Sequence, residues 1–164
     1  MTKSRLARAG FLILCVLSLL APSAGAAEAE VTRTSYREAV EPICEANTEA
    51  NERILAGVRH EVRAGRLRPA AAQFSRAARA LERTIAELRA VAPPPADRSR
   101  LSRWLGKVSV EASLFERIAS KLRAGQKAQA ERMVVKLTNN ANQANNVVTA
   151  FEFRYCRLEP SRFT

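Results

Sequence analysis

The chain has 164 residues and a formal net charge of +11, because 27 lysine and arginine residues outnumber 16 acidic residues. This length suits one domain with a single core. A single histidine and three cysteines leave no cluster with the ligand spacing of a zinc site once two cysteines pair, and the positive charge favours anionic partners.

The first 26 residues have the pattern of a secretory signal peptide. A basic start precedes an apolar run over residues 11–21, and Ala24-Gly25-Ala26 fits a cleavage site. The run is about half the length that a spanning helix needs. We expect the mature protein to be secreted, periplasmic or held in the cell envelope; an uncleaved N-terminal anchor is the alternative.

Cleavage leaves two cysteines, Cys44 and Cys156, because Cys15 lies inside the signal peptide. A pair of cysteines in an exported protein favours a disulfide. Two free buried thiols, which behave as small apolar side chains, are the alternative.

The mature chain is predicted to begin with a flexible lead, residues 27–34, followed by a single four-helix domain over residues 35–164. Ser35 and Glu38 fit a capping box at the start of the first helix. This helix should continue to about Ala64, with Gly65 as its stop. Pro42 predicts either a later start or a kink.

The second helix is predicted to begin near Pro69 and to end near Val91. Proline is tolerated at a first helical position because its missing N–H has no partner there. Three prolines at 93–95 then break the helical pattern and form a stiff connector. The apolar face has helical spacing and consists of Phe74, Ala77, Leu81, Ile85 and Leu88.

The third helix should begin near Asp97 or Ser99 and end at Gly125, and the fourth should run from about Lys127 to Tyr155 or Cys156. Both carry apolar residues in alternating steps of three and four. In the third these are Leu101, Leu105, Val108, Ala112, Phe115, Ala119 and Leu122. In the fourth they are Val134, Leu137, Ala141, Ala144, Val148, Phe151 and Tyr155.

Short turns after the first and third helices predict antiparallel neighbours. The fold class is therefore all-α, an up-down-up-down four-helix bundle. This topology brings the start of the first helix beside the end of the fourth, so we expect the Cys44–Cys156 disulfide to join them. We also expect Trp104 to cap one end of the core, with its indole N–H near solvent.

The sequence indicates no enzyme, metal or cofactor. No motif places a serine for nucleophilic catalysis, and no C-x-x-C-H sequence could attach haem. Glu45, Glu49 and Glu52 share a helix face, but a two-metal bundle site also needs Glu-x-x-His pairs, and the single histidine, His60, is not in such a pair.

The strongest functional lead is a group of cations that the topology places at one end of the bundle. Such groups bind phosphate or carboxylate. The alternative is a solvated surface, since helix C-termini attract bases for local reasons. We call this group the basic pole; it comprises Arg59, Arg63, Arg66, Arg68, Lys121, Arg123 and Lys127.

Three functional hypotheses follow. The first is an exported non-catalytic protein with a binding or structural role at the envelope, whose basic pole contacts an anionic polymer or membrane surface. The second is a carrier that holds a small apolar or amphipathic ligand between helices near Trp104 and Phe115. The third is a holder of other exported proteins. Specific nucleic-acid binding is not indicated, because aromatic residues do not alternate with the basic ones. The oligomeric state is not predicted.

Overall fold

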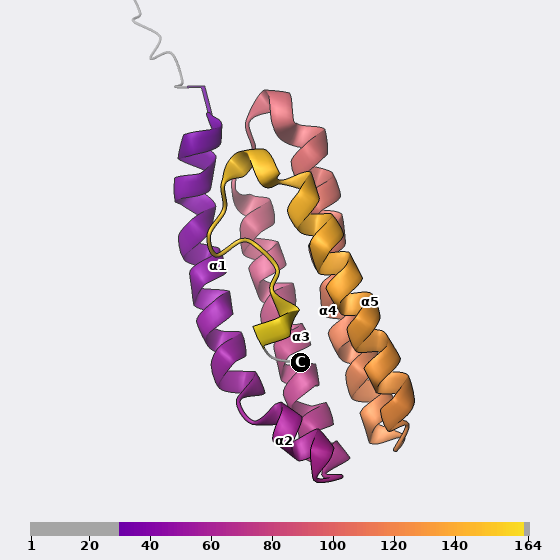
Figure 1. Ribbon diagram of the computed structural model, residues 1–164. Coiled ribbons are helices and arrows are strands. Elements are labelled where there is room, and N and C mark those ends of the chain that lie inside the picture. The colour runs from indigo at the N-terminus through magenta and orange to yellow at the C-terminus, as the bar shows by residue number, and fades with distance from the viewer. Residues whose placement is uncertain (1–29, 163–164) are drawn as a thin grey trace, which may run out of the picture.

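The computed structural model describes residues 30–162; the predicted signal peptide lies outside them. Four long helices alternate in direction, and a short one extends the first (Figure 1). The predicted all-α up-down-up-down bundle is confirmed. The helices are α1 (Arg33–Leu55), α2 (Val58–Arg63), α3 (Leu67–Ala90), α4 (Arg98–Arg123) and α5 (Lys127–Val147). Three 3₁₀ turns, Pro95–Asp97, Thr149–Phe151 and Pro160–Arg162, complete the described chain.

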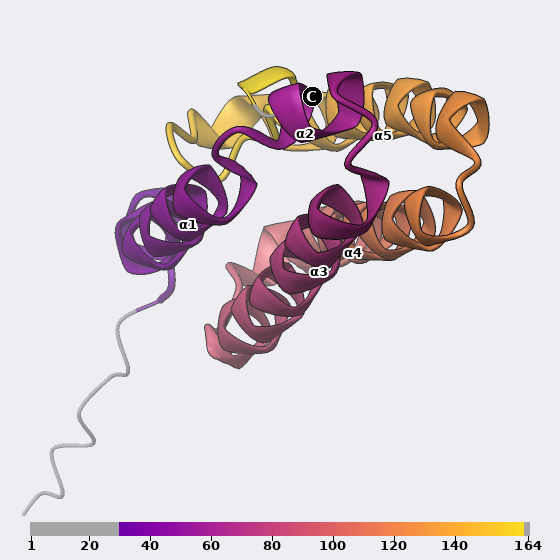
Figure 2. The same cartoon turned by 90° about the horizontal axis from the view of Figure 1, so that it is seen from below.

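The helices pack in sequence order: α1 against α3, α3 against α4, and α4 against α5. The pair α1 and α5 is absent from the extensively packed pairs, so helix packing alone leaves the bundle open on one side. Figure 2 shows this open arc, with residues 148–162 lying between α1 and α5. We call residues 148–162 the C-terminal segment. None of the helices within residues 30–162 is long and apolar enough to cross a membrane.

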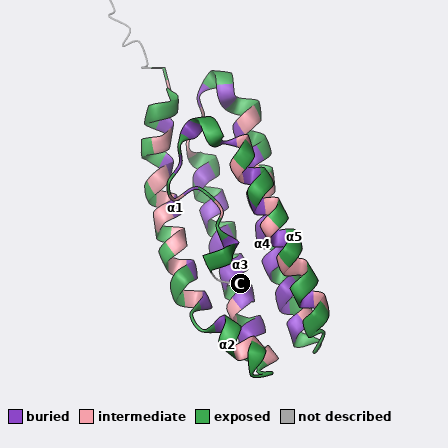
Figure 3. Ribbon diagram, in the orientation of Figure 1, coloured by how far each residue is buried: buried purple, intermediate pink, exposed green. Residues whose placement is uncertain are grey.

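The core is formed by the faces of the helices that point toward one another (Figure 3). The predicted stripe of α4 is buried as expected, except that Leu105 is only partly buried. On α3, the predicted apolar face is supplemented by small residues, including Ala70, Ala71 and Ala78, whose short side chains let neighbouring backbones approach closely.

The first helix begins earlier than predicted. Thr32 is the N-cap, and the Thr32 hydroxyl accepts a hydrogen bond from the Ser35 backbone N–H at 3.1 Å. The Ser35 hydroxyl accepts one from the Thr32 N–H at 3.0 Å in return. The capping box is therefore Thr32 with Ser35 rather than Ser35 with Glu38, and residues 33–34 are helical rather than part of the lead. Pro42 lies within α1 without ending it.

The first predicted helix is also interrupted, at Gly57, whose φ of +75° is left-handed. A left-handed residue stops a helix, and glycine adopts it without steric cost. The Gln73 amide of α3 donates to the carbonyls of Ile54 and Ala56, at 3.0 and 2.9 Å, and so satisfies carbonyls exposed by the break. The chain resumes as α2 and ends at the predicted stop, Gly65.

The fourth helix ends earlier than predicted, at Val147 rather than near Cys156. Phe151 and Phe153 are both buried, but residues two apart lie on opposite sides of a helix. Both rings reach the core only because the chain leaves the helix: a 3₁₀ turn is followed by Glu152 with φ of +53°. The predicted helical position of Tyr155 is therefore wrong.

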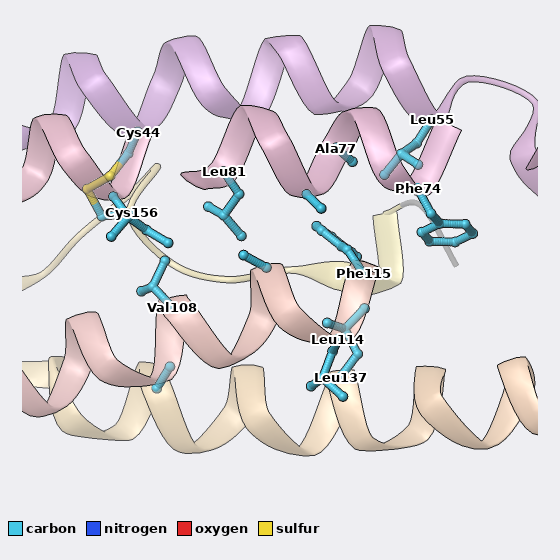
Figure 4. Packing of buried hydrophobic residues seen from close by; sticks show 14 of the residues in the cluster. Cys44, Leu55, Phe74, Ala77, Leu81, Val108, Leu114, Phe115, Leu137 and Cys156 are labelled. Atoms are coloured by element: carbon cyan, nitrogen blue, oxygen red, sulfur yellow. A yellow bond between two sulfur atoms is a disulfide. The ribbon is translucent and has the colours of Figure 1, made fainter. Parts of the chain in front are cut away.

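The predicted disulfide is present. Cys44 and Cys156 are joined, with their Cα atoms 5.0 Å apart. Figure 4 shows the bridge among buried side chains of the core, to which both cysteines belong. The bridge connects α1 to the C-terminal segment, because Cys156 lies beyond the end of α5.

Hydrogen bonds hold the C-terminal segment on both sides. On α1, the Glu41 carboxylate accepts from the backbone N–H groups of Arg154 and Tyr155, at 2.7 and 2.8 Å. On α5, the Asn145 side chain accepts from the Leu158 N–H at 2.9 Å and donates to the Leu158 carbonyl at 3.0 Å. The segment therefore closes the side of the bundle that the helices leave open.

An ion pair holds the start of α1. Arg33 donates to both carboxylate oxygens of Asp97, at 2.6 and 3.0 Å, and Asp97 is buried. Hydrogen bonds from Arg33 lower the pKa of the Asp97 carboxyl. Asp97 precedes α4, so this pair ties the start of α1 to the α3–α4 connection.

Replacement of both bridge cysteines, Cys44→Ala with Cys156→Ala, should lower the free energy of unfolding by about 3–5 kcal/mol, because the bridge closes a loop of more than a hundred residues. Urea unfolding, followed by circular dichroism, measures this loss. An unchanged unfolding midpoint would contradict the stabilising role.

Asp97→Asn should lower the melting temperature at pH 7. The lowered pKa means that the ionised pair stabilises the fold above the ordinary aspartate value of about 3.9 and that this contribution is lost as the pH falls through the lowered value. The difference from wild type should therefore shrink on acidification. Glu82→Gln, at an exposed position on α3, is the control. A difference that stays constant down to pH 2 would exclude a role for the carboxylate charge.

Candidate functional site

The basic pole lies at the end of the bundle that contains α2 and the α4–α5 turn (Figure 1). Arg59 and Arg63 are on α2, and Arg66 and Arg68 flank the start of α3. Lys121 and Arg123 lie in the last turn of α4, and Lys127 begins α5. The topology thus brings together cations from two separate turns.

Three cations of the basic pole have protein partners. Arg66 makes two hydrogen bonds to the Glu61 carboxylate, at 2.6 and 3.0 Å, which lower the pKa of that carboxyl. Arg123 pairs with Glu116 and donates to the Ser75 hydroxyl. Arg59 donates only to a backbone carbonyl, that of Ser161, at 2.6 Å.

The side chains of the other four cations form no hydrogen bond or ion pair within residues 30–162; these are Arg63, Arg68, Lys121 and Lys127. They remain available to an external anion. The pole is therefore partly neutralised, with its free charges on α2, α4, the first turn of α3 and the start of α5.

An apolar groove of about 300 Å³ opens beside these charges. It is bordered by α2, α3, α4 and α5, and three members of the basic pole (Arg59, Arg63 and Lys127) line it together with Glu131. Its other lining residues are Val58, Val62, Phe74, Ile118, Leu122, Ala130 and Val134. The break at Gly57 helps to form the groove, since it lets α2 change course from α1 (Figure 2).

The structure does not support the predicted place of Trp104. Its side chain is 1% exposed and packs on Phe153 with ring centroids 5.4 Å apart. The indole N–H is buried rather than near solvent. The reason is that the C-terminal segment, predicted to be helical as far as Tyr155 or Cys156, folds back and covers it. Phe115 is equally buried and packs on Phe74 at 6.0 Å.

Trp104 and Phe115 do line a shared cavity, but it is small and partly polar. Its volume is about 60 Å³. We call it the inner cavity. The helices α1, α3 and α4 form its inner walls, and residues 154–159 with Arg162 form its outer wall. The carrier hypothesis predicts a small apolar or amphipathic ligand between helices near these two residues, and a volume of about 60 Å³ limits a ligand held there to a compact molecule.

The inner cavity is lined by three buried side chains with polar atoms that lack a protein partner. These atoms are Asn51 Oδ1, Trp104 Nε1 and Glu111 Oε2. Buried polar groups normally have a hydrogen-bond partner. Burial raises the pKa of the Glu111 carboxyl to about 8, so Glu111 is mainly uncharged at neutral pH.

Glu111 was missed by the sequence analysis, although a signal for it exists. It lies three residues after Val108 and four before Phe115, both members of the predicted stripe of α4. A charged residue at this spacing faces the core. A carboxyl at a core-facing position points to a polar site inside the bundle.

Residues 30–162 contain no group of three or more histidine, cysteine, aspartate or glutamate side chains that could hold a metal ion. His60 lies exposed on α2. Comparison of the chain with protein-family models, curated proteins and solved structures finds no match. Function is therefore inferred from the groove and the inner cavity themselves.

Glu111→Gln should stabilise the protein increasingly as the pH rises from 5 to 8. The carboxyl ionises near its ordinary value of 4.5 when unfolded and near 8 when folded. Wild-type stability therefore falls across this interval, by about 3–5 kcal/mol at about 1.4 kcal/mol per pH unit. The glutamine side chain of the variant has no charge to bury. Thermal melts at several pH values measure this, and parallel pH profiles for the two proteins would contradict the burial of an ionisable group.

Proposed function

We propose that this protein is an exported, non-catalytic binding protein of the cell envelope whose ligands are single-chain anionic amphiphiles. The acyl chain would lie in the apolar groove, and the carboxylate or phosphate head would contact Arg63 and Lys127 at its rim. The main support for this is the placement of free cations directly beside apolar lining.

Each half of the site suits one half of such a ligand. Apolar lining gains about 25 cal/mol for each Å² of apolar surface removed from water, which favours an alkyl chain without selecting its head. Free guanidinium and ammonium groups at the rim then favour an anionic head over a neutral or cationic one. The groove volume of about 300 Å³ lies at the lower end of the range of volumes of ligand pockets. This size suits a ligand with a single acyl chain.

Two observations support the proposed location in the cell envelope. The disulfide is typical of oxidising compartments, and the sequence has the pattern of a signal peptide. A mature net charge of +8 follows if the first 26 residues are removed, since they hold three bases and no acids. Anionic amphiphiles are components of envelopes, and a basic exported protein would meet them there.

The proposal unites two of the sequence-based hypotheses. It keeps the basic pole as the anion-binding element, and it moves the amphipathic ligand from Trp104 and Phe115 to the groove. It commits to a free amphiphile rather than to docking on a membrane surface. No feature of residues 30–162 specifically favours the third hypothesis, a holder of other exported proteins.

The test is calorimetric titration of the mature protein with dodecanoate below its micelle concentration. We expect saturable binding that weakens as salt rises, and weaker binding of a dodecyl glucoside, which has the same chain and a neutral head. Arg63→Ala with Lys127→Ala should weaken dodecanoate binding at least about tenfold. The control is Arg76→Ala with Arg83→Ala, which removes equal charge from exposed positions on α3.

Ala130→Leu tests the groove separately, since the larger side chain fills part of the groove. It should weaken the binding of both dodecanoate and dodecyl glucoside. Equal binding by the two double variants would overturn the role of the basic rim. Binding to vesicles of anionic phospholipid without any binding of monomeric dodecanoate would also overturn the proposal, and would favour docking on membrane surfaces.

A further inference from the structure

The inner cavity lies apart from the groove and has a different chemical character. It contains a carboxyl group without a cation, an amide oxygen without a donor and an indole N–H without an acceptor. We propose that the inner cavity is a binding site for a small primary amine that also carries a hydrogen-bond acceptor, such as an amino alcohol or an amino amide.

The Glu111 carboxyl group, when ionised, needs a cation that residues 30–162 do not supply. Glu111 is 4% exposed and forms no ion pair within the described residues. A buried carboxylate is unfavourable unless it is paired and hydrogen-bonded. An ammonium group in the cavity would supply both the charge and the donors.

The charged side chains around the cavity do not fill this role. All of them except Glu111 belong to the C-terminal segment: Arg154, Arg157, Glu159 and Arg162, next to Tyr155. Arg162 is paired with Glu159 and Glu52, and the Arg154 guanidinium lies over the Tyr155 ring. Arg157 is exposed to solvent.

The lining contributed by α1 and α3 is uncharged and consists of Cys44, Asn47, Thr48, Asn51, Leu81, Thr84 and Leu88. The Glu111 carboxyl thus faces amide, hydroxyl and apolar groups on these helices. No basic side chain of α1 or α3 lines the cavity, so a cation there must come with the ligand.

The other two unpartnered atoms specify the rest of the ligand. Asn51 Oδ1 is an acceptor that lacks a donor, and an ammonium group has three N–H donors to share between Asn51 and Glu111. The indole N–H of Trp104 is a donor only, so it requires an acceptor on the ligand. A hydroxyl or carbonyl oxygen beside the ammonium group provides one.

The size of the cavity limits the ligand. One water molecule needs about 10–15 Å³ measured in this way, so a cavity of about 60 Å³ has room for about four to six water-sized groups. Ethanolamine, with four non-hydrogen atoms, is a suitable probe. Larger amines would exceed this volume.

Binding should release a proton. In the empty cavity, burial keeps Glu111 protonated up to about pH 8. When the ammonium form of the ligand enters, the Glu111 carboxyl proton leaves to solvent and the amine keeps its own proton. The apparent affinity should therefore rise about tenfold between pH 6 and pH 7 and level off above pH 8.

The experiment is calorimetric titration of the mature, disulfide-bonded protein with ethanolamine, n-propylamine and ethylene glycol. We expect ethanolamine to bind about tenfold more tightly than n-propylamine, which lacks the acceptor, and ethylene glycol not to bind measurably. Glu111→Gln should weaken ethanolamine binding at least about tenfold and abolish its pH dependence. Glu87→Gln, at an exposed position on α3, should leave both the affinity for ethanolamine and its pH dependence unchanged.

Trp104→Phe gives an independent check. It removes the indole donor and should reduce ethanolamine affinity to that of n-propylamine, while the pH dependence remains. The proposal is overturned if the three probes bind equally or not at all, if Glu111→Gln binds ethanolamine like wild type, or if a crystal soaked in ethanolamine contains only water in the cavity.

Discussion

The fold depends on how the bundle is closed between α1 and α5. These two helices are not extensively packed against each other, and the C-terminal segment fills the space between them. One covalent bond, Cys44–Cys156, and the hydrogen bonds of Glu41 and Asn145 hold it there. The segment buries Phe151 and Phe153 against the helices and forms the outer wall of the inner cavity. Without the segment, the aromatic face of Trp104 and the Glu111 carboxyl would be open to solvent.

The same arrangement separates two kinds of site. The groove at the basic pole is open and apolar with free cations at its rim, and the break at Gly57 helps to form it by letting α2 change course. The inner cavity is small and partly polar, and the C-terminal segment forms its outer wall. The groove suits a ligand with a large apolar part, whereas the cavity suits a compact polar one. The two proposed activities therefore rest on different residues and can fail independently.

The sequence predicts the helices and the bridge because both depend on simple rules: apolar spacing, Pro and Gly as helix breakers, and two cysteines that follow a predicted signal peptide. It does not predict the end of α5, because the repeat of three and four continues through Phe151 and Tyr155 although Phe153 also requires burial. The break at Gly57 is stabilised by Gln73, a residue distant in sequence. The cations of the basic pole are predictable from topology, but the groove beside them depends on side-chain packing. Glu111 could have been found from its position on the apolar stripe of α4.

The most direct test of this account is hydrogen exchange at the backbone amides of Arg154, Tyr155 and Leu158, measured by NMR on the disulfide-bonded protein. All three donate to carboxylate or amide oxygens of Glu41 and Asn145, so the account predicts exchange far slower than in an unstructured chain. Exchange of these amides at the unstructured rate, while amides of α3 and α4 stay protected, would show that the segment does not close the bundle and would contradict the account.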